Sequence, residues 1–134
     1  MSISSFDDLL QAARQQPEPQ RLLFVFASAD LPDDSTPEQR ERFLAGQGGA
    51  LVPMMYADKL PQDLHTFADL VRESEQFEKA WTIVFASSLS GIGGVAPTSE
   101  AAEQPLQRMV ESIKAGTLGT FIPFDREGHP VILG

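Results

Sequence analysis

The sequence contains no cysteine, and this absence excludes several kinds of chemistry at once. Without thiols the chain can form no disulfide, no thiolate metal site, no iron–sulfur cluster and no cysteine nucleophile. Basic residues are also scarce, since ten Lys and Arg stand against 19 Asp and Glu and leave a formal net charge of −9. Most of such a surface repels a phosphate backbone or an anionic bilayer. We therefore expect neither nucleic acid nor a membrane as a partner.

Long apolar runs are missing as well. The uninterrupted ones fall far short of the roughly 20 residues that a membrane-spanning helix needs, and residues 1–8 lack the basic start and apolar stretch of a secretory signal. The chain of 134 residues is 42% hydrophobic and 22% charged, which is typical of a folded globular protein. We expect a cytoplasmic protein that forms one α/β domain over residues 1–134.

The apolar pattern predicts helices that alternate with strands. A first helix capped by Ser4 or Ser5 should end before Pro17, and residues 22–27 should form a central strand covered on both faces. Thr36 and Pro37 are typical of a helix start, and that helix should end at Gly46. The other expected elements are a strand at 50–56 with an edge position or bulge at Pro53, a helix from Pro61 with Leu64, Phe67, Leu70, Val71 and Phe77 on its apolar face, and a strand at 81–86.

The last helix has two candidate starts. Thr98-Ser99-Glu100 is a capping pattern, but Pro105 would disrupt a helix that is already two turns long. We therefore expect the main helix to begin near Glu103 or Gln104. Its apolar stripe consists of Leu106, Met109, Val110 and Ile113.

Short segments in the first half of the sequence resemble segments in the second half, which suggests an internal duplication. The residue types of 25–28 recur at 84–87, those of 36–38 at 98–100 and those of 49–53 at 119–123, with offsets of 59, 62 and 70 residues. The pseudo-repeats would then cover about 4–56 and 61–133. The corresponding fold is a layered α/β sandwich with an α-β-α-β repeat, about four helices and a mixed or mostly parallel sheet of four or five strands. In it, the strands at 22–27 and 82–86 pair centrally.

A small-residue loop after the third strand is the one candidate site. Residues 91–96 match the dinucleotide-binding fingerprint formally, but the strand is not the first and the remaining residues cannot complete a nucleotide-binding half. A broader hypothesis is that hydroxyls and backbone N–H groups hold a small anion or nucleotide phosphate. The residues of this ligand-binding hypothesis are Ser87, Ser88, Ser90, Gly91, Gly93 and Gly94.

Catalytic and metal-binding patterns are otherwise missing. His65 and His129 are the two histidines, and they form no pair with the spacing of zinc ligands. The acidic stretch at 30–34 lacks the glycine and terminal glutamate of a calcium loop. The serines lack the frame of a hydrolase nucleophile. We expect no cofactor, no metal and no catalytic residue.

A hairpin is predicted at 119–133, with Gly128 supplying the positive φ of its turn. Pro123 and Pro130 lie in its two strands, and proline is typical of a sheet edge. The apolar residues of this hairpin favour core packing. A homodimer formed across residues 119–133 is the alternative.

Several segments together resemble a known family. Residues 23–28, 48–53, 90–94, 97–99 and 121–125 read LFVFAS, GGALVP, SGIGG, PTS and FIPFD. With these segments the whole chain resembles a family of small proteobacterial proteins of unknown role, whose members often carry the label "ribonucleotide reductase subunit alpha". Such reductases need cysteines for their thiyl radical, and this chain has none and is several-fold too short. The resemblance therefore implies no reductase activity and brings no functional residues.

Three functions stay open at this point. The first is a non-catalytic domain that binds another protein, favoured by the acidic charge and the lack of a reactive constellation. The second is a small-ligand or nucleotide-binding domain that uses the loop from Ser87 to Gly94. The third is an acidic immunity protein or inhibitor of a basic nuclease, which the size and charge allow.

Overall fold

The computed structural model describes residues 5–30, 37–38, 50–64, 66–77, 81–115 and 121–131. The helix expected from Thr36 to Gly46 lies outside these residues, apart from a helical Pro37 and Glu38. The elements in chain order are α1 (Phe6–Arg14), β1 (Gln20–Asp30), β2 (Ala50–Lys59), the 3-10 helix η1 (Pro61–Asp63), α3 (Phe67–Glu75), β3 (Ile83–Ser90), α4 (Ser99–Ala115) and β4 (Ile122–Phe124).

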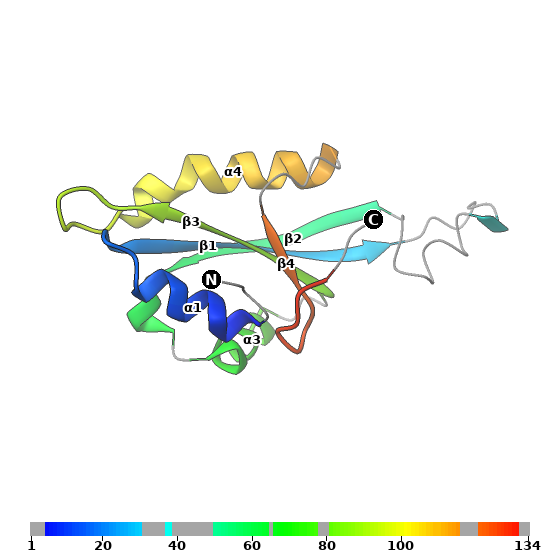
Figure 1. The fold of residues 1–134 in the computed structure, drawn as a ribbon. Coiled ribbons are helices and arrows are strands. Elements are labelled where there is room, and N and C mark those ends of the chain that lie inside the picture. The colour runs from blue at the N-terminus through cyan, green and yellow to red at the C-terminus, as the bar shows by residue number, and fades with distance from the viewer. Residues whose placement is uncertain are drawn as a thin grey trace.

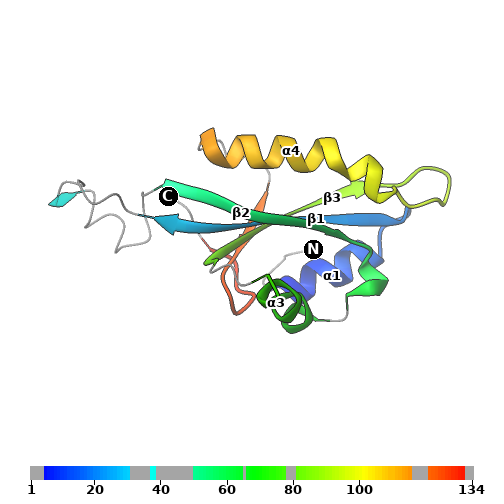
Figure 2. The ribbon, with the colours of Figure 1, turned by 180° about the vertical axis from the view of Figure 1, so that it is seen from behind.

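The four strands form one sheet in the order β2-β1-β3-β4. Every neighbouring pair is antiparallel. Helix α4 covers one face of the sheet, and α1 and α3 cover the other (Figures 1 and 2). The described residues therefore form a helix layer, a sheet and a second helix layer.

The prediction of a mixed or mostly parallel sheet is wrong. It rested on the burial of residues 22–27 on both faces, which is typical of parallel sheets. In this fold, helices cover both faces of an antiparallel sheet, so two-sided burial does not determine strand direction. The four strands and three α-helices of the described residues still make a layered α/β protein.

The described residues form two hydrophobic cores, one on each face of the sheet, and strand β1 contributes to both. Leu22, Phe24 and Phe26 project toward α1 and α3, and the alternate residues project toward α4. Because successive side chains of a strand point to opposite faces, an unbroken apolar run fills two cores. The sequence prediction of a strand covered on both sides is confirmed.

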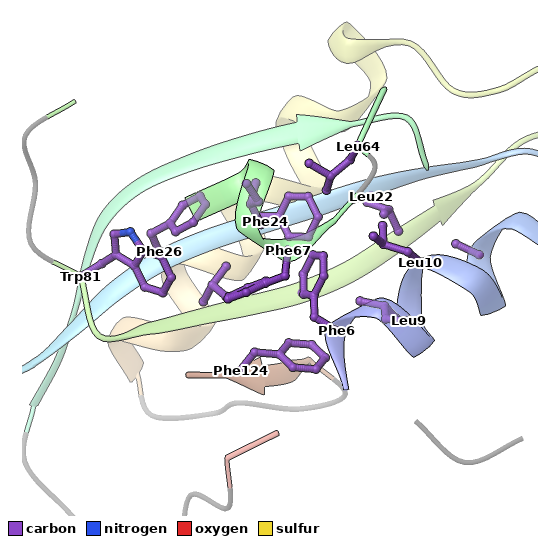
Figure 3. Close-up of a cluster of buried hydrophobic side chains, with 14 residues drawn as sticks. Phe6, Leu9, Leu10, Leu22, Phe24, Phe26, Leu64, Phe67, Trp81 and Phe124 are labelled. Carbon is purple, nitrogen blue, oxygen red and sulfur yellow. The ribbon is translucent and has the colours of Figure 1, made fainter. Parts of the chain in front are cut away.

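The core under α1 and α3 is built from aromatic rings (Figure 3). The ring centroid of Phe6 lies 5.6 Å from that of Phe24, 4.7 Å from that of Phe67 and 5.2 Å from that of Phe124. Phe6 is the first residue of α1, which Ser5 caps by accepting a hydrogen bond from the backbone N–H of Asp8. The cap thus fixes the residue that joins α1 to β1, α3 and β4.

The helix after Pro61 is shorter than predicted. Pro61 opens only η1, and α3 begins separately after Thr66, whose hydroxyl accepts a hydrogen bond from the Asp69 N–H. Phe67 and Leu70 are buried as expected, whereas Phe77 is 66% exposed. Phe77 lies beyond the end of α3, so the helical spacing that placed it on the apolar face no longer applies.

Two smaller predictions are confirmed. β2 is an edge strand with a bulge, since Phe26 pairs with Met55 and Ala27 with Pro53. The C-terminal turn is also present, with φ of 84° at Gly128 and an antiparallel bridge between Phe124 and Pro130.

The strands of the suggested duplication, β1 and β3, pair at the centre of the sheet. Their matched residues do not occupy matched positions, however. Val25 belongs to the core under α4, while Val84 belongs to the core under α1 and α3. If β1 and β3 were copies of one repeat, a two-fold rotation would relate these antiparallel neighbours, and each residue would lie on the same face of the sheet as its copy. Val25 and Val84 lie on opposite faces, so an offset of 59 residues does not superpose the two strands. The pseudo-repeats at 4–56 and 61–133 stay a prediction.

Helix α4 begins earlier than predicted. It starts at Ser99 and runs through Pro105, and the Thr98 hydroxyl accepts a hydrogen bond from the Ala101 N–H at 3.0 Å. Pro105 lies on the partly exposed side of the helix, while Ala102, Leu106, Met109 and Ile113 are buried against the sheet. Burial of this stripe outweighs the cost of one proline, which explains why the expected start near Glu103 or Gln104 is wrong.

Pro105→Ala should stabilise the protein by about 1–3 kcal/mol, because proline in a helix interior is roughly 3 kcal/mol less favourable than alanine. The substitution restores an N–H that can donate to the carbonyl of Ala101. Urea unfolding followed by circular dichroism measures the change. Gln104→Ala, at an exposed neighbouring position, is the control and should change stability by less than about 0.5 kcal/mol. A loss of stability in Pro105→Ala would contradict the prediction.

Candidate functional site

The three serines of the predicted loop lie in a strand. β3 extends to Ser90, so Ser87, Ser88 and Ser90 pair with Leu23, Leu22 and Gln20 of β1. Side chains alternate along a strand, which places Ser87 on the α4 face and the other two on the opposite face. The hydroxyls therefore do not converge on one point.

The glycines that follow form a tight turn. The Ile92 N–H donates to the Val95 carbonyl and the Val95 N–H donates back to the Ile92 carbonyl, each at 3.1 Å. Gly93 and Gly94 occupy the two central positions with φ of 61° and 80°. Two consecutive positive φ values are typical of a type I′ turn, which glycine adopts without steric cost. We call residues Gly91 to Val95 the glycine turn.

Protein acceptors already occupy most of the glycine turn's N–H groups. Gly91 donates to the carbonyl of Pro19 at 2.8 Å, and Gly94 donates to the Oε2 of Glu18, also at 2.8 Å. The Ser90 hydroxyl accepts a hydrogen bond from the Nε2 of Gln20 at 2.7 Å. An anion bound at the Gly94 N–H would have to displace the carboxylate of Glu18. The six-residue ligand hypothesis stays a prediction, and no contact among the described residues favours it.

The glycine turn carries exposed apolar side chains. Ile92 is 86% exposed and Val95 is 70% exposed, more than any other large apolar side chain in the described ranges. The turn projects past the end of the sheet, beyond the first residues of α4 (Figure 1). Its two β-branched side chains therefore extend into solvent from a hydrogen-bonded base.

A groove lies between the glycine turn and the first half of α4. Its volume is about 740 Å³, and its apolar lining includes Leu89, Ile92, Val95 and Pro97. Charged groups also line it, namely Glu100, Glu103 and Arg108, while Glu18 lies outside this lining and accepts a hydrogen bond from the Gly94 N–H. We call this space the α4 groove. Among the described residues, two carboxylates and one guanidinium group therefore line the α4 groove, so negative groups outnumber positive ones there.

A polar cluster holds the start of α4 against the sheet. The Nη1 of Arg21 lies 2.6 Å from the Oδ2 of Asp58, and its Nε donates to the carbonyl of Pro97 at 2.6 Å. The Ser99 hydroxyl donates to the same carboxylate. The sequence analysis missed this cluster, because its members are separated by 37 to 78 residues and form no local pattern.

The cluster positions one wall of the α4 groove. Arg21 comes from β1, Asp58 from β2 and Ser99 from the first turn of α4. The charged side chains are only 14% and 19% exposed, so water screens their interaction less than it does at the surface. The cluster therefore anchors Pro97 and the first turn of α4, which line the groove, to β1 and β2.

No cluster of metal ligands occurs within the described ranges. His129 is exposed beside Asp125 and Glu127, with its Nδ1 3.9 Å and 3.7 Å from their carboxylates. His65 lies outside the described residues. Of the helices that the structure describes, none has the length and apolarity to cross a bilayer.

Comparison with known proteins yields no match among family models, curated proteins or solved structures. Function therefore rests on the geometry above. The homodimer across residues 119–133 stays a prediction, of which the structure describes residues 121–131.

Proposed function

We propose that the protein is a non-catalytic, cytoplasmic domain that binds a basic surface of another protein through the glycine turn and the α4 groove. The observation that carries this proposal is the exposure of Ile92 and Val95, at 86% and 70%. The geometry of the turn requires glycine at Gly91, where a Cβ would clash, and at the two central positions with positive φ, but it sets no such requirement at positions 92 and 95. Its flanking positions are exposed and would accept polar residues, so two β-branched apolar side chains there favour contact with a partner.

The rigidity of the glycine turn supports binding. Its base donates to Pro19, its tip donates to Glu18, and its ends exchange two hydrogen bonds. Valine and isoleucine also have few side-chain rotamers to lose. Less conformational entropy is therefore lost when a partner covers the turn.

Charge favours a basic partner. Three carboxylates lie near the apolar side chains of the glycine turn, those of Glu18, Glu100 and Glu103. Among the described residues that line the α4 groove, one side chain is basic, that of Arg108. The formal net charge of −9 would steer a basic protein toward the chain and repel an acidic one. An apolar centre with a charged rim is the usual composition of a protein interface.

The double variant Ile92→Ser/Val95→Ser should lose the partner and keep its fold. Both side chains are exposed, so we expect a change in stability of less than about 1 kcal/mol, and a loss of roughly tenfold or more in affinity if each contributes as an interface anchor. The measurement is quantitative affinity capture from lysate, followed by titration of the purified partner at two salt concentrations.

Val52→Ser is the matched control, because Val52 is also an exposed β-branched residue, at 41%, but lies on β2. It should capture the partner as the native chain does. Equal capture by the Ile92→Ser/Val95→Ser variant would refute the proposed interface. A basic enzyme that loses activity in the complex would identify the chain as an inhibitor.

A further inference from the structure

The edge of the sheet at β2 carries an inference that is independent of the glycine turn. β2 is the last strand of the order β2-β1-β3-β4, and no described strand pairs with its outer side. The carbonyl of Pro19, which directly precedes β1, accepts a hydrogen bond from the Gly91 N–H. The carbonyl of Ala27, which lies within β1, accepts one from the Thr82 N–H. Both donors flank β3. The odd-numbered residues of β1 therefore direct their backbone groups toward β3.

The alternation of an antiparallel ladder then fixes the direction of the β2 backbone. The even-numbered residues of β1 bond to β2, and Phe24 and Phe26 face Ala57 and Met55 in the register. Ala57 and Met55 thus direct their N–H and C=O groups inward. Tyr56 and Asp58, which alternate with them, direct theirs outward, so the edge offers two donors and two acceptors in the spacing of a β-strand.

A pocket lies beside this edge on the α3 side. Its volume is about 270 Å³, and its apolar lining comes from Phe26, Met55, Ala57, Leu70 and Phe77. Sites for whole small molecules have volumes of roughly 300–1,000 Å³. The pocket is smaller, which favours one side chain of a longer ligand. We call it the β2 pocket.

The charges at the rim of the β2 pocket are paired within the protein. The Nζ of Lys59 lies 2.8 Å from the Oε2 of Glu73, and Asp58 is bound by Arg21 at 2.6 Å. A charged side chain entering the pocket would lose its hydration without gaining a free counter-ion. The complementary occupant is therefore apolar and uncharged.

We propose that the β2 edge and the β2 pocket together bind an extended, neutral peptide segment of a partner protein. The segment adds a strand antiparallel to β2, and its residues opposite Tyr56 and Asp58 exchange backbone hydrogen bonds with them. The residue between these two lies opposite Ala57. Directly opposed residues share a face of the sheet, so its side chain enters the pocket between β2 and α3.

The probe is a set of seven-residue peptides, acetylated and amidated, with three threonines on each side of a central residue. With Leu or Phe at the centre, amide resonances of residues 55–59 should shift on titration, and the affinity should be roughly tenfold higher than with Asp or Lys at the centre. Tyr56→Pro removes one outward donor without removing a bond to β1, so it should weaken binding roughly fivefold more than Tyr56→Ala.

Three outcomes would overturn the inference: no shift at residues 55–59 with any peptide at millimolar concentration, equal binding of the Leu and Asp peptides, or equal binding by Tyr56→Pro and Tyr56→Ala variants that both fold. Concentration-dependent shifts at β2 without peptide would instead assign the edge to a second copy of the chain. The Ile92→Ser/Val95→Ser variant should bind the peptide normally, so failure here and failure of the glycine-turn interface are distinguishable.

Discussion

Phe24→Ala should lower the free energy of unfolding by about 3–5 kcal/mol, the range for deletion of a buried aromatic ring. Phe24 has no exposed surface, and its ring lies 5.6 Å from that of Phe6. Phe6 also contacts the rings of Phe67 and Phe124, so the substitution removes the β1 member of an aromatic cluster whose rings come from two helices and two strands (Figure 3). Such a cluster collapses poorly around a cavity because its members belong to separate elements.

The measurement for Phe24→Ala is urea unfolding followed by circular dichroism. Phe77→Ala is the control with the same change in chemistry at a side chain that is 66% exposed, and its effect should stay below about 1 kcal/mol. Comparable losses in the two variants would show that the aromatic core does not hold α1 and α3 on the sheet. A changed dependence on urea would indicate that the variant unfolds in more than one step.

The sequence predicted local structure well wherever one element determined its own pattern. The Ser5 cap with its apolar stripe predicted α1, and the apolar run at 22–27 predicted a strand buried on both faces. Pro53 correctly indicated an edge strand with a bulge. In each case the sequence signal that predicted the element lies within a few residues along the chain.

Strand direction and the extent of α4 depended on contacts between distant residues. Both faces of the sheet are buried whether its strands run parallel or antiparallel, so burial could not determine direction. Pro105 correctly indicated a local cost, but packing of Leu106 and Met109 against β1 and β3 overrides it. The Arg21–Asp58–Ser99 cluster likewise has no local pattern.

The anion-binding hypothesis for residues 87–94 stays a prediction, and the structure adds contacts there that the residue types alone do not indicate. The residue types at 87–94 suggested a loop that binds a small anion or a nucleotide phosphate. β-Pairing with Gln20 extends the strand through Ser90, and internal acceptors take up the N–H groups of Gly91 and Gly94. The exposure of Ile92 and Val95 follows from the turn geometry, which a composition-based interpretation could not supply.

Gly91→Ala should destabilise the protein by about 3 kcal/mol, at the upper end of the cost of overpacking. A Cβ at this position would lie 2.2 Å from the Val95 carbonyl oxygen and 2.8 Å from that of Pro19. Both atoms belong to the backbone, so neither can move without breaking a hydrogen bond of the glycine turn. The added methyl group therefore separates the turn either from its own closing residue or from residue 19.

Gly93→Ala is the matched control for Gly91→Ala. No atom lies within 4 Å of a Cβ at Gly93, and only its φ of 61° is unfavourable, so we expect a loss of roughly 1–2 kcal/mol. Thermal and urea unfolding measure both variants, and amide spectra report on Ile92 and Val95. If Gly91→Ala costs no more than Gly93→Ala, the turn is not held against Pro19 as described. If it costs more and also weakens partner capture while the Gly93 variant does not, binding depends on the position of the two apolar side chains and not only on their presence.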